Sequence, residues 1–318
     1  MVGTVNRRQA VKIGLPGLAS ASLAGADPAR TNERRGRRTA FVLVHGSWHG
    51  AWCWGLVEPH LRRGGASSIA IDLPGHGLDA RIPASFRDRA RDRAAFEVEP
   101  SYLRDLTAAD YAGAVVDAAE QARLSGAERV ILVGHSMGGV PVTFAAGRSP
   151  DIADGLVYVS AVAPTPGRTG GYYTTLPAAA GQGKIGSVIV GDAGRIGALR
   201  WDPHSKDDAY RAKAKDALAA DVDDRLLDAA MHLFTPDAPA NIYGEEAEFA
   251  PDFARIPRAY IRCLRDFTVV LAQQDAEIAD MDAAFPDNPT RVYDLDTSHE
   301  AMFAKPEELA AALLDFAG

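Results

Sequence analysis

The chain has 318 residues, of which 47% are hydrophobic and 24% charged, with a formal net charge of -8. This composition is typical of a globular enzyme, and the absence of any uninterrupted apolar run near roughly 18 residues argues against an integral membrane protein. The negative charge argues against a nucleic-acid-binding surface, which needs clustered Lys and Arg in surplus. Cys53 and Cys263 lie far apart in unrelated contexts, so we expect buried thiols and no disulfide scaffold.

Residues 1–38 are expected to form an export leader or a disordered tail. The stretch Asn6–Lys12 carries two adjacent arginines and precedes a weakly apolar run, Ile13–Leu23, which ends at the small residues Ala24–Ala26. This order resembles a bacterial twin-arginine leader, which exports folded proteins. We therefore expect export through the twin-arginine pathway, with a cytoplasmic protein bearing a basic tail as the alternative.

From residue 40 onward, short apolar runs alternate with longer amphipathic ones, a pattern typical of βα units on a mostly parallel sheet. A helix is predicted from Thr107 to Leu124, because Thr107 and Asp110 have N-cap spacing and Gly126 follows the helix end. A second helix is predicted from Met137 to about residue 147. Buried strands are predicted at 40–44, 68–71, 130–133 and 156–162.

The alternation stops between about residues 163 and 257, where a Gly-rich opening leads to predicted helices at 207–218 and 224–234. It resumes with strands at 259–264 and 290–295, and the chain closes with a helix at 306–316 that has proline at its first position. We interpret residues 39–318 as one α/β domain, with helices on both faces of the sheet. The interruption at 163–257 is then a helical cap over the strand ends.

The segment Gly134-His135-Ser136-Met137-Gly138 matches G-x-S-x-G and lies between a predicted strand and a predicted helix. This is the context of a nucleophile elbow, in which glycines permit a turn so tight that the serine adopts a strained backbone conformation. The alternative is a Gly-rich turn without chemistry. The strand before it and the helix after it favour Ser136 as a nucleophile.

A serine hydroxyl needs a base that accepts its proton, and His299 is the best candidate among the eight histidines. It follows the last predicted strand, so a parallel sheet would place it at the same carboxyl edge as Ser136. His49, His204 and His232 could contact substrate, although a lone histidine is more often structural. No histidine spacing indicates a metal site.

The carboxylate that orients the histidine should lie between the serine and the histidine in chain order. Asp266 meets this demand, because it follows the strand at 259–264 by two residues. Asp275, in a predicted helix, is the second choice. Asp294 and Asp296 lie within or at the end of the strand before His299 and would point poorly at its ring.

Backbone N–H groups must stabilise the negative charge that develops on the substrate oxygen, each worth roughly 3 kcal/mol. One should belong to Met137, the residue after the nucleophile. We expect the other from Ser47, in the loop after the first strand. Its neighbours Gly46, Trp48 and His49 are expected to contact substrate.

Five motifs in this order resemble the branch of α/β-hydrolases that includes plant methyl esterases and hydroxynitrile lyases. They are Phe41–Trp54, Asp72–Gly77, Gly134–Gly139, Ile261–Asp266 and Ser298–Met302. The resemblance covers about residues 40–317. It implies the α/β-hydrolase fold, a catalytic triad of Ser136, Asp266 and His299, an oxyanion hole formed by Ser47 and Met137, an apolar pocket under a helical cap, and no cofactor.

Two departures from that branch bear on the chemistry. Hydroxynitrile lyases of the rubber-tree and cassava type have a threonine at the position of Gly46 and a lysine at that of Glu300. Without that lysine a departing cyanide would lack its stabiliser, so lyase chemistry is not expected. Epoxide hydrolases and dehalogenases place an aspartate at the nucleophile, and Ser136 argues against both.

The sequence thus favours a serine hydrolase that cleaves a small to medium apolar carboxylic ester through an acyl-enzyme on Ser136. A lactonase that uses the same triad is one alternative, and a non-catalytic small-molecule receptor of the same fold is another. The expected partner is a small ester or lactone, without nucleic acid, membrane, metal or cofactor. A homo-oligomer stays an open option.

Overall fold

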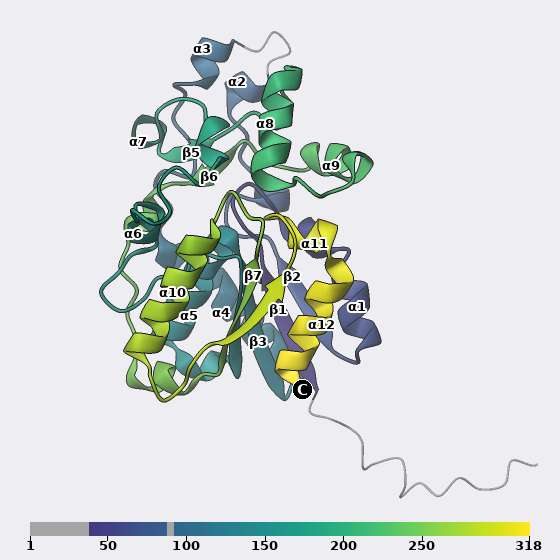
Figure 1. The fold of residues 1–318 in the computed structure, drawn as a ribbon, viewed down its shortest axis with the longest axis vertical. Helices are drawn as coiled ribbons and strands as arrows, with labels where there is room; N and C mark the ends of the chain where they lie inside the picture. The colour runs from purple at the N-terminus through teal and green to yellow at the C-terminus, as the bar shows by residue number, and fades with distance from the viewer. Residues whose placement is uncertain (1–37, 88–91) are drawn as a thin grey trace, which may run out of the picture. The chain divides into compact units, whose positions relative to one another are not determined.

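A computed structural model describes residues 38–87 and 92–318, and the predicted export leader lies outside these residues (Figure 1). A six-stranded sheet with the order β2-β1-β3-β4-β7-β8 forms the centre of the described chain. Every neighbouring pair in it is parallel. The strands are β1 (Thr39–Val44), β2 (Ser67–Ile71), β3 (Arg129–His135), β4 (Gly155–Val159), β7 (Arg258–Cys263) and β8 (Arg291–Leu295).

The central strands are apolar along nearly their whole length because both faces of the sheet are covered. In β1, Phe41 and Leu43 pack into the core on one face, and Val42 and Val44 pack into the core on the other. This alternation follows from the two-residue period of a strand. The run at residues 40–44 is therefore continuously apolar because its side chains are buried on both faces of the sheet.

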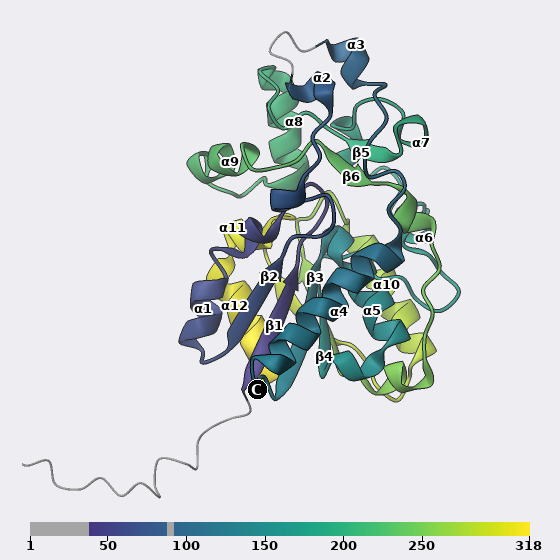
Figure 2. The same ribbon diagram turned by 180° about the vertical axis from the view of Figure 1, so that it is seen from behind.

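Helices cover both faces of the sheet, as predicted (Figures 1 and 2). One face carries α1 (Glu58–Arg63), α11 (Ala301–Ala304) and α12 (Pro306–Ala317), and the other carries α4 (Ala108–Leu124), α5 (Gly139–Arg148) and α10 (Leu271–Ala284). Helix α4 begins with the predicted cap: Thr107 Oγ1 accepts from the Asp110 N–H, and the Asp110 carboxylate accepts from the Thr107 N–H. These helices and the parallel sheet confirm the predicted fold class.

The predicted cap region contains a two-stranded antiparallel sheet, β5 (Ala198–Arg200) and β6 (Asp237–Pro239). Its helices are α6 (Gly170–Thr174), α7 (Ala193–Ile196), α8 (Asp208–Leu218) and α9 (Asp224–Met231). Figure 2 shows that α2 (Ala84–Arg87) and α3 (Arg93–Phe96), which come well before this region in the chain, lie on the same side of the central sheet as these helices. The layer over the strand ends is therefore built from two separate stretches of chain.

Arg200 joins these two stretches. Its guanidinium binds the Asp237 carboxylate through two hydrogen bonds of 2.6 and 2.7 Å and donates to the carbonyl oxygens of Phe96 and Glu99 at 2.5 and 2.8 Å. Both charged side chains are buried. Since a bidentate Arg–carboxylate pair is strong and directional, Arg200 fixes β5, β6 and the segment after α3 to one another.

Short 3-10 helices complete the described chain: Ala51–Trp54, Gly77–Asp79, Ser136–Gly138, Pro150–Ile152, Ile185–Ser187, Asn241–Gly244 and Pro251–Arg255. Both cysteines are free and buried, as expected. Within residues 38–87 and 92–318, no helix is long and apolar enough to cross a membrane.

Candidate active site

Ser136 lies at the sharp turn between β3 and α5 and has a φ of 53°, in the left-handed region that side chains rarely adopt. Two glycines make this turn possible. A Cβ on Gly134 would come within 2.5 Å of the Gly138 carbonyl oxygen, and a Cβ on Gly138 would come within 2.6 Å of the His45 carbonyl oxygen. The turn therefore has the strained geometry that a nucleophile elbow requires.

Gly46 packs directly against this elbow. A Cβ at position 46 would stand 2.7 Å from the Ser136 Cβ, so only glycine lets the loop after β1 approach so closely. The Ser136 carbonyl oxygen accepts from the Val162 N–H at 2.9 Å, which ties the elbow to the chain after β4. Gly46 thus allows the predicted oxyanion loop to lie beside Ser136.

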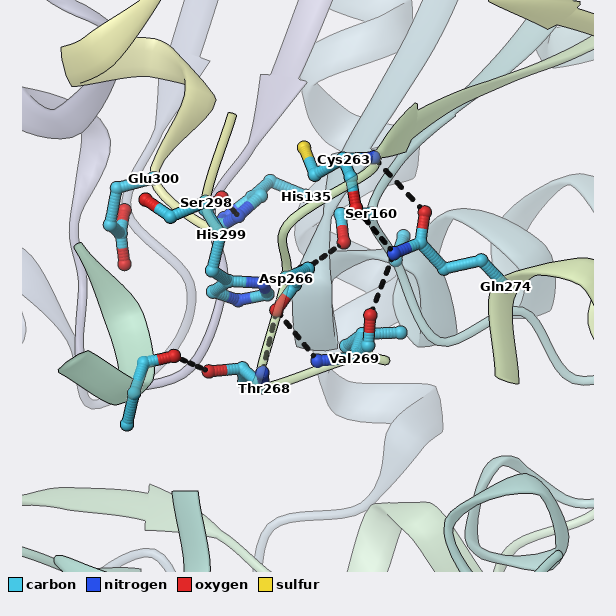
Figure 3. A network of polar contacts seen from close by, with 12 residues as sticks. His135, Ser160, Cys263, Asp266, Thr268, Val269, Gln274, Ser298, His299 and Glu300 are labelled. Atoms are coloured by element: carbon cyan, nitrogen blue, oxygen red, sulfur yellow. Dashed lines mark hydrogen bonds and ion pairs between the residues drawn. The ribbon is translucent and has the colours of Figure 1, made fainter. Parts of the chain in front are cut away.

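The structure brings Asp266 and His299 together, with 2.6 Å between Asp266 Oδ2 and His299 Nδ1 (Figure 3). Asp266 follows β7 and His299 follows β8, and these strands are paired up to Cys263 and Leu295. Backbone hydrogen bonds from Leu264 to Leu295 and from Arg265 to Thr297 continue the pairing beyond the strands. The parallel register therefore delivers both side chains to the same edge.

Four donors converge on the buried Asp266 carboxylate. Oδ1 accepts from the N–H groups of Thr268 and Val269 at 2.6 and 3.1 Å, and Oδ2 accepts from Ser160 Oγ as well as from His299. An acceptor on this side requires that His299 Nδ1 carry a proton, which leaves Nε2 free to act as a base when the ring is neutral.

The rival carboxylates lie elsewhere. Asp275 and Asp294 both bind Arg262, at 2.6 and 2.8 Å, and Asp296 binds Arg265 at 2.7 Å. Each of these ion pairs is at least partly exposed, whereas Asp266 and His299 are both buried. The geometry therefore favours the first choice made from the sequence, Asp266.

Ser160 also belongs to the site, although no sequence motif points to it. It follows β4 and has a φ of 39°, and its hydroxyl donates to the same Asp266 oxygen that binds His299. Strand β4 ends at Val159, three residues earlier than predicted, because a residue with positive φ cannot continue a strand. A single serine after a strand has no recognisable motif, so only the folded chain reveals this contact.

Two opposing effects act on His299. Burial lowers the pKa of its ring, whereas the Asp266 carboxylate, its hydrogen bond and the nearby Glu300 raise it, and the net pKa lies above the ordinary 6.5. A general base must be neutral to accept a proton. Any activity that depends on His299 should therefore fall at a pH somewhat above 6.5 as the solution is acidified.

Ser136 and His299 are linked through His135. The His135 and His299 ring centroids are 4.6 Å apart, and His135 Nε2 donates to the His299 carbonyl oxygen at 3.1 Å. Among the described residues, no hydrogen bond joins Ser136 Oγ to His299 Nε2. Catalytic hydrogen bonds in ligand-free enzymes are often long and shorten only when substrate binds.

His45 fixes the peptide that carries the predicted Ser47 donor. Its Nε2 accepts from the Leu73 N–H at 3.1 Å, so the ring proton is on Nδ1, which donates to the Gly46 carbonyl oxygen at 2.8 Å. In a trans peptide the Gly46 carbonyl and the Ser47 N–H point in opposite directions. His45 thereby sets the direction of the Ser47 N–H, although the oxyanion hole of Ser47 and Met137 stays a prediction.

A cavity of about 370 Å³ opens at Ser136. Its walls come from the loop after β1, the elbow, the cap and the start of α10, and none of the lining side chains is charged. The lining residues are Ser47, Trp48, Ser136, Val162, Thr174, Ile185, Gly186, Ile189, Leu199, Ala240, Tyr243, Thr268, Val269 and Gln273.

Of the three residues that the sequence predicts to contact substrate, Trp48 lies in the wall of this cavity, whereas Gly46 and His49 do not. Gly46 packs against Ser136, and His49 is buried behind the wall, where its Nε2 lies 3.0 Å from Glu300 Oε2. In the part of the chain that the structure describes, no group of three or more His, Cys, Asp or Glu residues is placed to hold a metal ion.

A strained serine between a parallel strand and a helix, with a carboxylate–histidine pair at the same sheet edge, is the architecture of α/β-hydrolases. The model of the alpha/beta hydrolase family matches residues 41–312, and the chain belongs to this family.

Individual relatives align with this chain over most of its length. Methylesterase 9 of Arabidopsis thaliana is 27% identical over 285 residues, which cover 87% of this chain and 97% of the relative. Pheophorbidase of Raphanus sativus is 27% identical over 281 residues, covering 86% and 92%. The crystal structure of a pyrethroid hydrolase from Sphingobium faniae is 25% identical, with a TM-score of 0.65, and covers 88% of this chain and 97% of that one. The resemblance to plant methyl esterases is thus confirmed.

Proposed function

We propose that this protein is a serine hydrolase that cleaves uncharged carboxylic esters through an acyl-enzyme. The observation that carries the proposal is the buried 2.6 Å contact between His299 and Asp266, at the sheet edge where Ser136 stands in a strained turn. The relatives named as methylesterase and pyrethroid hydrolase support ester cleavage as the reaction.

In this mechanism Ser136 Oγ attacks the ester carbonyl carbon while its proton passes to His299 Nε2. The N–H groups of Ser47 and Met137 stabilise the negative oxygen of the tetrahedral intermediate. The intermediate collapses, the C–O bond to the alcohol breaks, and His299 returns the proton to the departing oxygen. Water then attacks the acyl-serine by the same steps, releasing the acid and restoring Ser136.

The cavity indicates which esters fit. Its lining is mainly apolar, and its polar groups are uncharged hydroxyl and amide side chains such as those of Thr174, Tyr243 and Gln273. A charged substrate would lose its hydration there without gaining an ion pair, which is costly. We therefore infer a small to medium neutral ester. A lactone presents the same carbonyl and is the alternative substrate.

A fluorophosphonate probe tests the nucleophile directly. Mass spectrometry of the labelled protein should place the adduct on the peptide that contains Ser136, and Ser136→Ala should abolish it. Hydrolysis of p-nitrophenyl acetate, butyrate and octanoate at pH 8, with Ser136→Ala as the control, should show turnover that depends on Ser136. Ligand binding without labelling or turnover would instead identify a receptor and overturn the proposal.

A further inference from the structure

Glu300 and His49 form a second buried carboxylate–histidine contact beside the site. Glu300 follows His299 in the chain, and in the view of Figure 3 its side chain lies on the side of His299 remote from Asp266. Its Oε2 is 3.0 Å from His49 Nε2, and both side chains are at most 2% exposed. The mechanism above gives neither residue a role.

The hydrogen bonds of His49 determine where its protons are. Nδ1 lies 2.7 Å from the Ser47 carbonyl oxygen, which can only accept, so Nδ1 carries a proton. Nε2 faces Glu300, which accepts as a carboxylate. Burial raises the pKa of Glu300, but the attraction of His49, the hydrogen bond with it and the nearby His135 and His299 together lower this pKa to about 2. Both ring nitrogens of His49 therefore face acceptors, the Ser47 carbonyl oxygen and the Glu300 carboxylate.

Aromatic rings pack around His49. Trp52 stacks on it with ring centroids 5.7 Å apart, and Phe234 meets it in an edge-to-face contact with centroids 4.5 Å apart. These rings hold the imidazole in place between Ser47 and Glu300.

The contact joins two loops that the proposed reaction needs. His45 fixes the peptide before Ser47, and His49 fixes the peptide after it through the Ser47 carbonyl. His49 is in turn held by Glu300, next to the general base. We propose that His49 donates one hydrogen bond to Glu300 and one to the Ser47 carbonyl oxygen, and that this pair is a positioning device, which holds Ser47 and its N–H in register with His299.

This inference rests on the proposed function for its effect on rate, but the two hydrogen bonds of His49 can be tested without any reaction. In protein labelled with ¹⁵N-histidine, NMR at pH 8 should show a proton on both ring nitrogens of His49. A ring with one bare nitrogen at pH 8 would overturn the inference. Because this measurement uses the unmodified protein, it does not depend on whether variants fold.

Kinetics test the positioning role. Glu300→Gln and His49→Gln should each lower kcat for p-nitrophenyl butyrate about tenfold to a hundredfold, with little change in KM. This loss is smaller than the roughly 10²- to 10³-fold loss in kcat that follows removal of an oxyanion donor itself. The double variant should lose no more than the worse single variant, because both changes break one contact. Unchanged kcat, or losses that multiply in the double variant, would overturn the positioning role.

A pH profile separates this role from a purely structural one. Glu300 raises the pKa of His299, so Glu300→Gln should move the acid limb of kcat to lower pH. The matched control is Glu308→Gln, which removes an exposed carboxylate paired with Lys305 and should change neither kcat nor the limb. If the acid limb of kcat stays at the same pH in Glu300→Gln, this result contradicts the proposed role of the Glu300–His49 pair. The other titratable groups near it are His45, Cys53, His76, His135, Cys263 and His299.

If neither labelling nor turnover of the unmodified protein is detected, the proposed function fails, and the NMR result still decides the state of the pair. If Ser136 is labelled but Glu300→Gln behaves like the unmodified protein, only the further inference fails.

Discussion

At Asp266, two carboxylate oxygens accept from four donors, and only one of these donors is the His299 ring. The other three come from Ser160, Thr268 and Val269, and they hold the carboxylate in one orientation beside the His299 ring. An aspartate so fixed can impose one ring tautomer on the histidine. The contribution of Asp266 is therefore expected to be large and to depend on its charge.

The variant Asp266→Asn tests whether the charge of Asp266 matters, because the amide has almost the same shape as the carboxylate. An amide that donates to His299 Nδ1 would force the proton onto Nε2, so the ring could no longer accept from Ser136. In proteases with a Ser-His-Asp triad this exchange lowers kcat by about 10⁴, and we expect a loss of about 10³ to 10⁴ in kcat for p-nitrophenyl butyrate. Asp275→Asn, in the ion pair with Arg262, is the control and should stay within about twofold. A similar loss in both variants would argue against Asp266.

The residues of the site differ in how far the sequence reveals them. Ser136 is revealed by its glycines, which the turn requires, and Asp266 by its distance from a strand end. Ser160 and the partner of Glu300 have no such signal, because each contact joins residues more than a hundred positions apart without a motif. His49 was expected to contact substrate, but which way a loop side chain points depends on packing that the sequence does not show.

At the scale of elements, the strands of the central sheet follow from apolar runs bounded by turn residues, and the predicted ends lie close to those observed. The cap is less predictable. The segment at residues 92–101 joins it because Arg200 binds the carbonyl oxygens of Phe96 and Glu99, and backbone carbonyls leave no trace in a sequence. Polar bonds between distant stretches, unlike periodic apolar patterns, become visible only in the folded chain.

Asp237→Asn tests how strongly this contact holds the elements together. It would leave the buried Arg200 guanidinium without its counter-charge, and breaking one side of a buried ion pair typically costs about 3–5 kcal/mol of unfolding free energy. Urea unfolding followed by tryptophan fluorescence measures the change. Asp228→Asn, which breaks the exposed pair with Arg211, should cost about 0–1 kcal/mol. Equal effects in the two variants would show that Arg200 does not lock the cap.

At the scale of the molecule, His45, His76 and His135 are buried where the first loop, the Asp72–Gly77 turn and the elbow meet. The ring centroids of His45 and His76 lie 5.1 Å apart. Burial lowers the pKa of all three, that of His76 to about 4, and the nearby ring of His49 lowers each of these pKa values further. The folded protein therefore keeps them neutral under conditions in which the unfolded chain would protonate them.

This difference sets the response of the whole chain to acid. Between pH 6.5 and about 4 the unfolded chain binds more protons than the folded one at these histidines, so the unfolding free energy should fall as pH falls, by up to about 1.4 kcal/mol per pH unit for each histidine. Urea unfolding at pH 7.5, 6.5 and 5.5 measures the slope. His76→Gln should make it shallower, whereas His60→Gln, on the outer helix α1, should not. A slope that His76→Gln leaves unchanged would mean that His76 titrates in the folded protein as it does in the unfolded chain.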